Sequence, residues 1–234
     1  MRRGIPSLPV VFRRVPGERG CHRTPINLYS MVTLWIVPSD EESAKLRRIL
    51  SIGSSTTTSS ETQSYPAFHP HITLAAPPSS TSLTLEQLRH SIPNPLPIKF
   101  PFHFKSVNTG DHYFRSVYIA IQLSPVLISL HADVHASLDL EPRTPMFPHL
   151  SLCYITDKDD NIGEERQRWR DQLEASGRIR NTSSEGSGVE LNCSVDDAGD
   201  DWISELTANE IWFVDCVGPV GSWSVLDKLR LRPK

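Results

Sequence analysis

The sequence predicts an α+β fold of two similar lobes, each a small antiparallel sheet backed by helices. The first observation behind this prediction is that the chain passes twice through the order strand, helix, strand. The second is that the last strand of each round carries one pattern: Pro70–Leu74 reads PHITL and Pro148–Leu152 reads PHLSL. At 234 residues, with 38% hydrophobic residues, the chain is long enough to bury a sizeable core.

The first round is read from local signals. Val32–Val37 is an apolar run rich in β-branched residues, which predicts a strand. Ser39-Asp40-Glu41-Glu42 has the spacing of a capping box, so a helix should begin directly after that strand. The first motif strand is expected at His69–Ala76, and the capping pattern Thr84–Gln87 should begin a second helix.

The second round repeats this order and is followed by closing strands. Pro after Ser at positions 124 and 125 marks the start of its helix, because Pro is favoured at the first helical position. The expected segments are strands at Ile98–Val107 and Tyr113–Leu123, the motif strand His149–Ile155, a helix at Gly163–Ala175, and strands at Val189–Val195, Thr207–Val217 and Trp223–Leu231.

Residues 1–30 differ in composition from the rest of the chain. They are rich in Arg and Pro, and Glu18 is their only acid. Four prolines argue against the amphipathic helix of a mitochondrial presequence. We expect residues 1–30 to be a disordered extension, and residues 31–234 to form the folded domain.

Charge and cysteine usage limit the function classes. A formal net charge of −3 gives no electrostatic footprint for long nucleic acid, which favours a small anionic substrate. No apolar run reaches the ~18 residues that a membrane span needs. The four cysteines lack metal-ligand spacing and are too few for a disulfide framework. We therefore expect an intracellular protein, cytoplasmic and monomeric, without a metal or other cofactor.

The doubled motif sets the candidate site. In a strand, alternate side chains point to opposite faces, so His71 and Thr73 share one face while Ile72 and Leu74 point into a core. The second motif does the same, with one imidazole and one hydroxyl in front, at positions 149 and 151, and two leucines behind. Each lobe thus presents one histidine and one hydroxyl.

Two imidazoles and two hydroxyls facing one cleft suit the cleavage of an anionic ester. Imidazole can act as acid or base near neutrality, so His71 and His149 are the candidate catalytic residues. Thr73 and Ser151 are the candidate donors to the non-bridging phosphate oxygens. The pseudo-symmetry leaves the two histidine roles open; our interpretation takes His149 as base and His71 as acid.

At these residues the chain resembles the two-histidine phosphoesterase superfamily, and more closely its fungal and plant cyclic nucleotide phosphodiesterases. The similarity extends to Trp35-Ile36-Val37-Pro38, to Asn108-Thr109-Gly110 and to the run Tyr113–Tyr118, and covers roughly residues 32 to 231. The resemblance implies a pseudo-symmetric fold of two lobes with one motif per lobe facing a central cleft. It also implies opening of nucleoside 2',3'-cyclic phosphates to 2'-phosphates, and hydrolysis of ADP-ribose 1'',2''-cyclic phosphate, a by-product of tRNA splicing.

The same resemblance suggests further substrate contacts. Trp35, Phe114 and Tyr154 match positions where relatives present aromatic residues to the cleft, which predicts stacking on a nucleobase. Aromatic residues in strands also commonly belong to a core, so both interpretations stay open for these three. Resemblance to fungal relatives leaves association with the Golgi open as well.

Several alternatives remain at this stage. The protein could process RNA ends on oligonucleotides, or it could be a nucleotide-binding module without catalysis. His69 has the same strand parity as His71 but lies outside the repeat, so we expect it at the cleft rim without a chemical role. His131 and His135 lie four apart on the expected helix, but without a third ligand we expect a solvated helix face.

Overall fold

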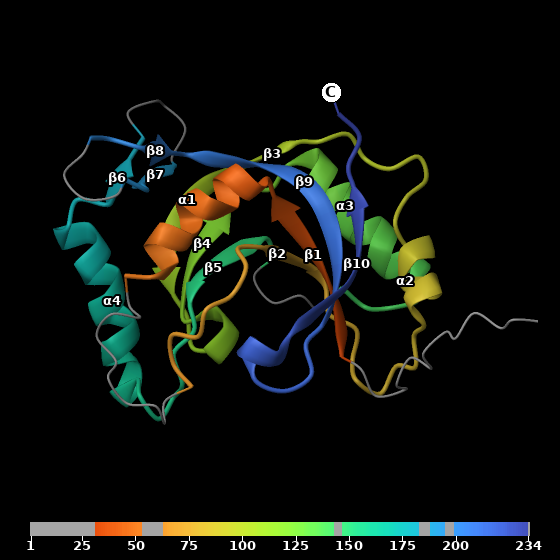
Figure 1. The fold of residues 1–234 in the computed structure, drawn as a ribbon, viewed down its shortest axis with the longest axis horizontal. Coiled ribbons are helices and arrows are strands. Elements are labelled where there is room, and N and C mark those ends of the chain that lie inside the picture. The colour runs from red at the N-terminus through yellow and green to blue at the C-terminus, as the bar shows by residue number, and fades with distance from the viewer. Residues whose placement is uncertain (1–30, 53–62, 143–146, 183–187, 195–198, 234) are drawn as a thin grey trace, which may run out of the picture.

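The structure is a computed structural model that describes residues 31–52, 63–142, 147–182, 188–194 and 199–233 (Figure 1). The expectation of a disordered extension at residues 1–30 lies outside the described residues. Among the helices of the described ranges, none is long and apolar enough to cross a membrane.

The main sheet contains seven strands, paired antiparallel throughout. Their order is β1 (Val32–Pro38), β2 (Ile72–Ala75), β5 (His149–Cys153), β4 (Val117–Ile121), β3 (Pro101–Thr109), β9 (Glu205–Asp215) and β10 (Ser224–Arg230). Because β9 also pairs with β1, all of these strands except β10 close into a ring. A small second sheet contains β6 (Ile179–Asn181), β7 (Val189–Asn192) and β8 (Trp202–Ile203).

The two predicted rounds are β1–α1–β2 and β4–α3–β5, so the α+β prediction with antiparallel sheets is confirmed. Helix α1 (Asp40–Leu50) packs against β1 and β5, and helix α3 (Pro125–Ser137) packs against β2. The helix that precedes each motif strand therefore lies behind the motif strand of the other round. Helices α4 (Glu164–Ala175) and α2 (Leu85–His90) lie at opposite ends of the molecule in Figure 1.

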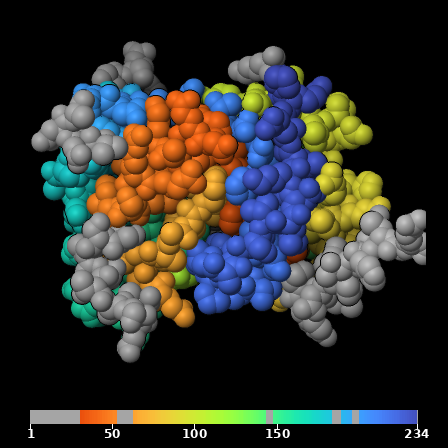
Figure 2. All heavy atoms as spheres, in the orientation of Figure 1, coloured from red at the N-terminus to blue at the C-terminus, as the bar shows by residue number. Residues whose placement is uncertain are grey.

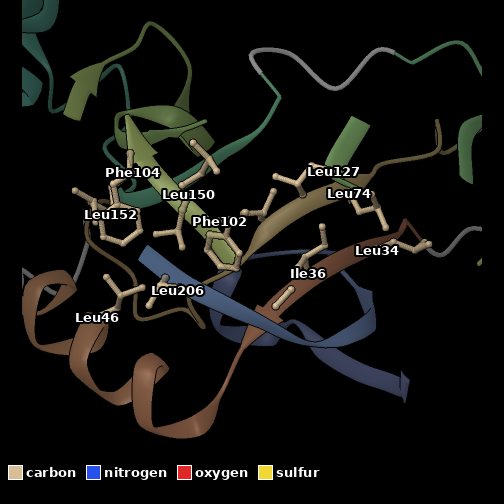
Figure 3. Packing of buried hydrophobic residues seen from close by; sticks show 14 of the residues in the cluster. Leu34, Ile36, Leu46, Leu74, Phe102, Phe104, Leu127, Leu150, Leu152 and Leu206 are labelled. Carbon is tan, nitrogen blue, oxygen red and sulfur yellow. The ribbon is translucent and has the colours of Figure 1, made fainter. Parts of the chain in front are cut away.

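The core lies between these strands and helices, on the back of the motif strands. Ile72, Leu74, Leu150 and Leu152 are fully buried, as their strand parity predicts. Figure 3 shows the two leucines of β5 beside the phenylalanines of β3, and Leu74 beside Leu127 of α3. Each such buried side chain contributes about 1.5–3 kcal/mol relative to leaving it in water. This burial fixes which face of β2 and β5 is left for the histidines.

Local capping signals place the helices as predicted. The Ser39 side chain accepts from the backbone N–H of Glu42, whose carboxylate accepts from the Ser39 backbone in return, which completes the capping box. The same carboxylate group also accepts from the backbone N–H of Thr207 of β9, at 2.9 Å. In the space-filling view, α1 (orange) and the closing strands (blue) accordingly lie side by side (Figure 2).

One predicted strand was too long. We expected Tyr113–Leu123 to be extended, but Tyr113–Arg115 forms a 3-10 turn and β4 begins at Val117. The turn forms because the His112 side chain accepts from the Phe114 backbone N–H, while the His112 carbonyl accepts from the backbone N–H of Arg115. Two residues of this turn, Phe114 and Arg115, line the candidate site.

Candidate functional site

All the residues that the sequence predicted for the site line one cavity, of about 750 Å³. His71 and Thr73 come from the β2 segment, and His149 and Ser151 come from β5. The three predicted aromatic residues, Trp35, Phe114 and Tyr154, line the same cavity. The size falls within the range of small-molecule sites.

The pairing of the two motif strands explains how the polar groups meet. Ile72 lies opposite Leu150 in the antiparallel β2–β5 pair. In an antiparallel ladder this register sets Thr73 opposite His149 and His71 opposite Ser151, with all four on the face away from the core. Each histidine therefore faces the hydroxyl residue of the other motif, so the site needs both motifs.

His71 is held tightly. Its Nδ1 lies 2.6 Å from the backbone oxygen of His69. Because a carbonyl oxygen only accepts, Nδ1 carries the proton and donates it, which leaves Nε2 of the neutral ring as the free acceptor. The ring stacks on the indole of Trp35, with centroids 3.6 Å apart and planes within 8°.

The electrostatic environment of His71 favours its neutral form. The pKa of His71 is lowered from 6.5 to about 3, chiefly by burial of the ring and also by the neighbouring His69 and His149, while the hydrogen bond to the His69 carbonyl partly opposes this. At neutral pH the ring is therefore uncharged. A neutral imidazole with a free Nε2 can accept a proton.

His149 has a different environment. It is half-buried at the start of β5, and its ring packs edge to face against Tyr118 of β4, with centroids 5.5 Å apart. His149 thus has an aromatic wall on its β4 side, whereas His71 is covered by the β1 indole. The two imidazoles are equivalent by motif but not by surroundings.

The two hydroxyls also differ. Ser151 is buried and donates to the backbone oxygen of Phe114 at 2.7 Å, which ties β5 to the 3-10 turn. Thr73 is half-buried on the opposite strand. Thr73 can donate to a bound oxyanion directly, whereas Ser151 must turn its hydroxyl away from the Phe114 carbonyl to do so.

The aromatic residues form a connected wall. Tyr154 is buried and stacks on Phe68 at 4.1 Å between centroids. Phe114 is 40% exposed and lies 5.6 Å from Trp223, which the sequence analysis did not assign to the site. Trp223 also packs edge to face on Trp35, at 5.8 Å. It enters the site from the turn before β10, and no local pattern indicates that this distant segment returns to the cleft.

The other histidines take different places. We expected His69 at the cleft rim, but its ring packs on Trp212 of β9 at 4.4 Å, and His69 is not among the residues that line the cavity. The solvated face expected for the His131 and His135 pair is wrong for His135, which is buried and lines the cavity, while His131 stacks on Phe147. In the described ranges, no group of three or more His, Cys, Asp or Glu could hold a metal ion.

An α+β fold in which paired His-x-Thr and His-x-Ser motifs face one cavity defines the two-histidine phosphoesterase class. Comparison with known proteins gives the family: the model for cyclic phosphodiesterase-like proteins matches residues 31–231. The chain belongs to this family, so the resemblance seen in the sequence is confirmed. A cyclic phosphodiesterase of Arabidopsis thaliana is 23% identical over 136 residues, which cover 57% of this chain and 71% of that protein.

Solved structures show the same fold at low identity. A phosphoesterase structure matches with a TM-score of 0.50 at 13% identity, covering 87% of this chain and 98% of that one. LigT of E. coli in complex with NADP+ matches with a TM-score of 0.50 at 12% identity, covering 86% of this chain and 98% of that one. These similarities support the fold, while the activity has to be argued from the site.

Proposed function

We propose that this protein hydrolyses five-membered cyclic phosphodiesters by paired-histidine acid–base catalysis. Membership of the cyclic phosphodiesterase-like family supports cyclic phosphodiester hydrolysis in general. The proposed substrates are nucleoside 2',3'-cyclic phosphates, opened to 2'-phosphates, and ADP-ribose 1'',2''-cyclic phosphate, opened to the 1''-phosphate. In this role the protein would consume small by-products of tRNA splicing and would require no metal.

The observation that carries the proposal is the register of the motif strands. The Ile72–Leu150 pair sets His71 and His149 on one face, each opposite a hydroxyl residue, over a cavity of about 750 Å³. A cyclic phosphate bound there would have one imidazole on each side. Such an arrangement suits in-line attack by water on one side of phosphorus and departure of a ribose oxygen on the other.

We assign His71 as the base and His149 as the acid. The lowered pKa of His71 keeps its ring neutral, and its Nε2 is free to accept a proton from the attacking water. As the water oxygen bonds to phosphorus, the bond to the ribose oxygen breaks and His149 donates its proton to that oxygen. This assignment reverses the one favoured by the sequence, where nothing distinguished the two histidines.

The remaining site residues would bind the substrate. Thr73 and Ser151 would donate to the two non-bridging phosphate oxygens, where negative charge develops as water attacks. Phe114 is 40% exposed and its ring lies beside that of Trp223, so these two residues would hold the nucleobase. Trp35 is occupied by its stack on His71, and Tyr154 by its stack on Phe68, so these two line the cavity and support its other residues.

A product analysis tests the proposal. Adenosine 2',3'-cyclic phosphate is incubated with the protein in ¹⁸O-labelled water, and the products are resolved by ³¹P NMR and mass spectrometry. The expected product is adenosine 2'-phosphate with one solvent oxygen on phosphorus. Formation of the 3'-phosphate, or no turnover of any cyclic phosphate, would contradict the proposal.

A further inference from the structure

The charges that line the cavity are unequal. Its charged lining residues are Asp111, Arg115, Asp139 and Glu141. Arg115 is thus the one Lys or Arg of the described residues on this lining, whereas the substrate proposed above is an anion. In a site with three carboxylates and a single guanidinium, an anionic substrate depends on that guanidinium for its attraction to a positively charged side chain.

The Arg115 side chain has unused hydrogen-bonding capacity. It is only 17% exposed, and its Nε is buried with no hydrogen-bond partner among the described residues. One terminal nitrogen donates to Asp111 Oδ1 at 2.9 Å, but the Asp111 side chain is 92% exposed. An ion pair with so exposed a carboxylate contributes little, so a phosphate can replace Asp111 as the partner.

The position of Arg115 relative to the catalytic pair is set by Tyr118. The guanidinium carbon lies over the Tyr118 ring at 5.8 Å from its centroid, and His149 packs against that same ring at 5.5 Å. A Cβ on Gly110 would come within 3.1 Å of Arg115 Nε and 2.3 Å of the Arg115 backbone oxygen, so only glycine permits this arrangement. Arg115 and His149 therefore contact the same aromatic ring.

We propose that Arg115 binds a second phosphate group of the substrate, next to the phosphate between the histidines. The cleft would then favour cyclic phosphates that carry an additional phosphate or diphosphate over plain nucleoside cyclic phosphates. Asp111 pairs with the guanidinium and gives it up when that second phosphate binds. This inference rests on the proposed function, because it takes the reacting phosphate to lie at His71 and His149.

Binding of product-like nucleotides tests the inference without requiring catalysis. Isothermal titration calorimetry compares adenosine 2'-phosphate with adenosine 2',5'-bisphosphate at constant ionic strength. The protein should bind the bisphosphate about tenfold more tightly or better, as expected for one charge-assisted hydrogen-bonded contact. Equal dissociation constants for the two nucleotides would overturn the inference.

Three variants test whether Arg115 is responsible for the preference for the bisphosphate. In Arg115→Gln the preference for the bisphosphate should fall to about twofold or less, and Arg115→Lys should retain part of it, because Lys keeps the charge but not the planar fork. Asp111→Asn should strengthen the preference, because it removes a competing carboxylate. The matched control is Arg47→Gln, an exposed arginine of α1 outside the cavity lining, which should behave as the unchanged protein.

A purely structural role for Arg115 makes different predictions. If Arg115 only pinned the turn through Asp111, then Arg115→Gln and Asp111→Asn would weaken both nucleotides equally, and that result would refute the inference. If Arg115→Gln did not fold, Arg115→Lys and Asp111→Asn would still decide it. Turnover of a nucleoside 2',3'-cyclic phosphate is assayed separately, so failure of the proposed function is distinguishable from failure of the second-phosphate site.

Discussion

The environment of His71 predicts a specific dependence of stability on pH. The folded state holds this ring neutral and lowers its pKa from 6.5 to about 3. At this histidine the folded protein therefore binds fewer protons than the unfolded chain at any pH between these values. This group costs no stability well above pH 6.5. As the pH falls from 6.5 toward 3, protonation of the unfolded chain at this histidine lowers the free energy of unfolding.

The size of the effect follows from the same two values. Each unit of difference between the folded and unfolded pKa corresponds to about 1.36 kcal/mol. The full loss of unfolding free energy would therefore approach ~5 kcal/mol near pH 3. Between pH 7 and pH 5, where the unfolded chain becomes mostly protonated at this histidine, the loss is about 2 kcal/mol. A loss of that size is a large part of the total stability of an ordinary domain.

The assay is urea unfolding at pH 7 and pH 5 of the unchanged protein and of His71→Gln. Other groups also titrate in this range, so the quantity compared is the loss of unfolding free energy from pH 7 to pH 5 in each protein. The unchanged protein should lose about 2 kcal/mol more than His71→Gln does. His90→Gln removes an exposed imidazole of α2 and should lose as much as the unchanged protein. Equal losses in the unchanged protein and His71→Gln would refute the buried, neutral state of His71.

Three further predictions concern catalysis and the limits of the domain. Because His71 stays neutral to low pH, the acid limb of the kcat/KM profile should lie well below pH 6.5; a limb centred at 6.5 or above would contradict the assignment of His71 as base. Hydrolysis of a cyclic phosphate should survive exhaustive dialysis against EDTA, and loss of activity with recovery on adding zinc or magnesium would reject the two-histidine mechanism. A chain that begins at Met31 should match the full chain in melting temperature and turnover, and a large loss of either would show that residues 1–30 belong to the domain.

The sequence could predict what depends on local order. Strand alternation placed Ile72 and Leu150 in the core and the two histidines on the opposite face, because side chains alternate with a period of two in any strand. The capping box at Ser39 predicted the start of α1, because its hydrogen bonds are made within four residues. The four motif residues line one cavity because they lie on that alternating face, and the three aromatic residues that the family resemblance suggested line it as well.

What the sequence could not predict depends on contacts between distant segments. The stack of His71 on Trp35 and the resulting burial come from the pairing of β1 with β2, and they distinguish two histidines that are identical by motif. Trp223 reaches the cleft through the return of the chain between β9 and β10. The 3-10 turn at Arg115 replaced an expected strand because a single side-chain acceptor, His112, outweighed the β-propensity of the run.

The central claim is that the two repeated histidines, and not a neighbour, perform the chemistry. The most direct test is kcat/KM for a nucleoside 2',3'-cyclic phosphate in folded His71→Ala, His149→Ala and His69→Ala variants. His71→Ala and His149→Ala should each lose about 100- to 10,000-fold, as expected for removal of a general base or acid. His69→Ala should lose far less, because its ring packs on Trp212 and only its backbone carbonyl contacts His71. Equal losses in His69→Ala and His71→Ala, or near-normal turnover in His149→Ala, would contradict the paired-histidine account.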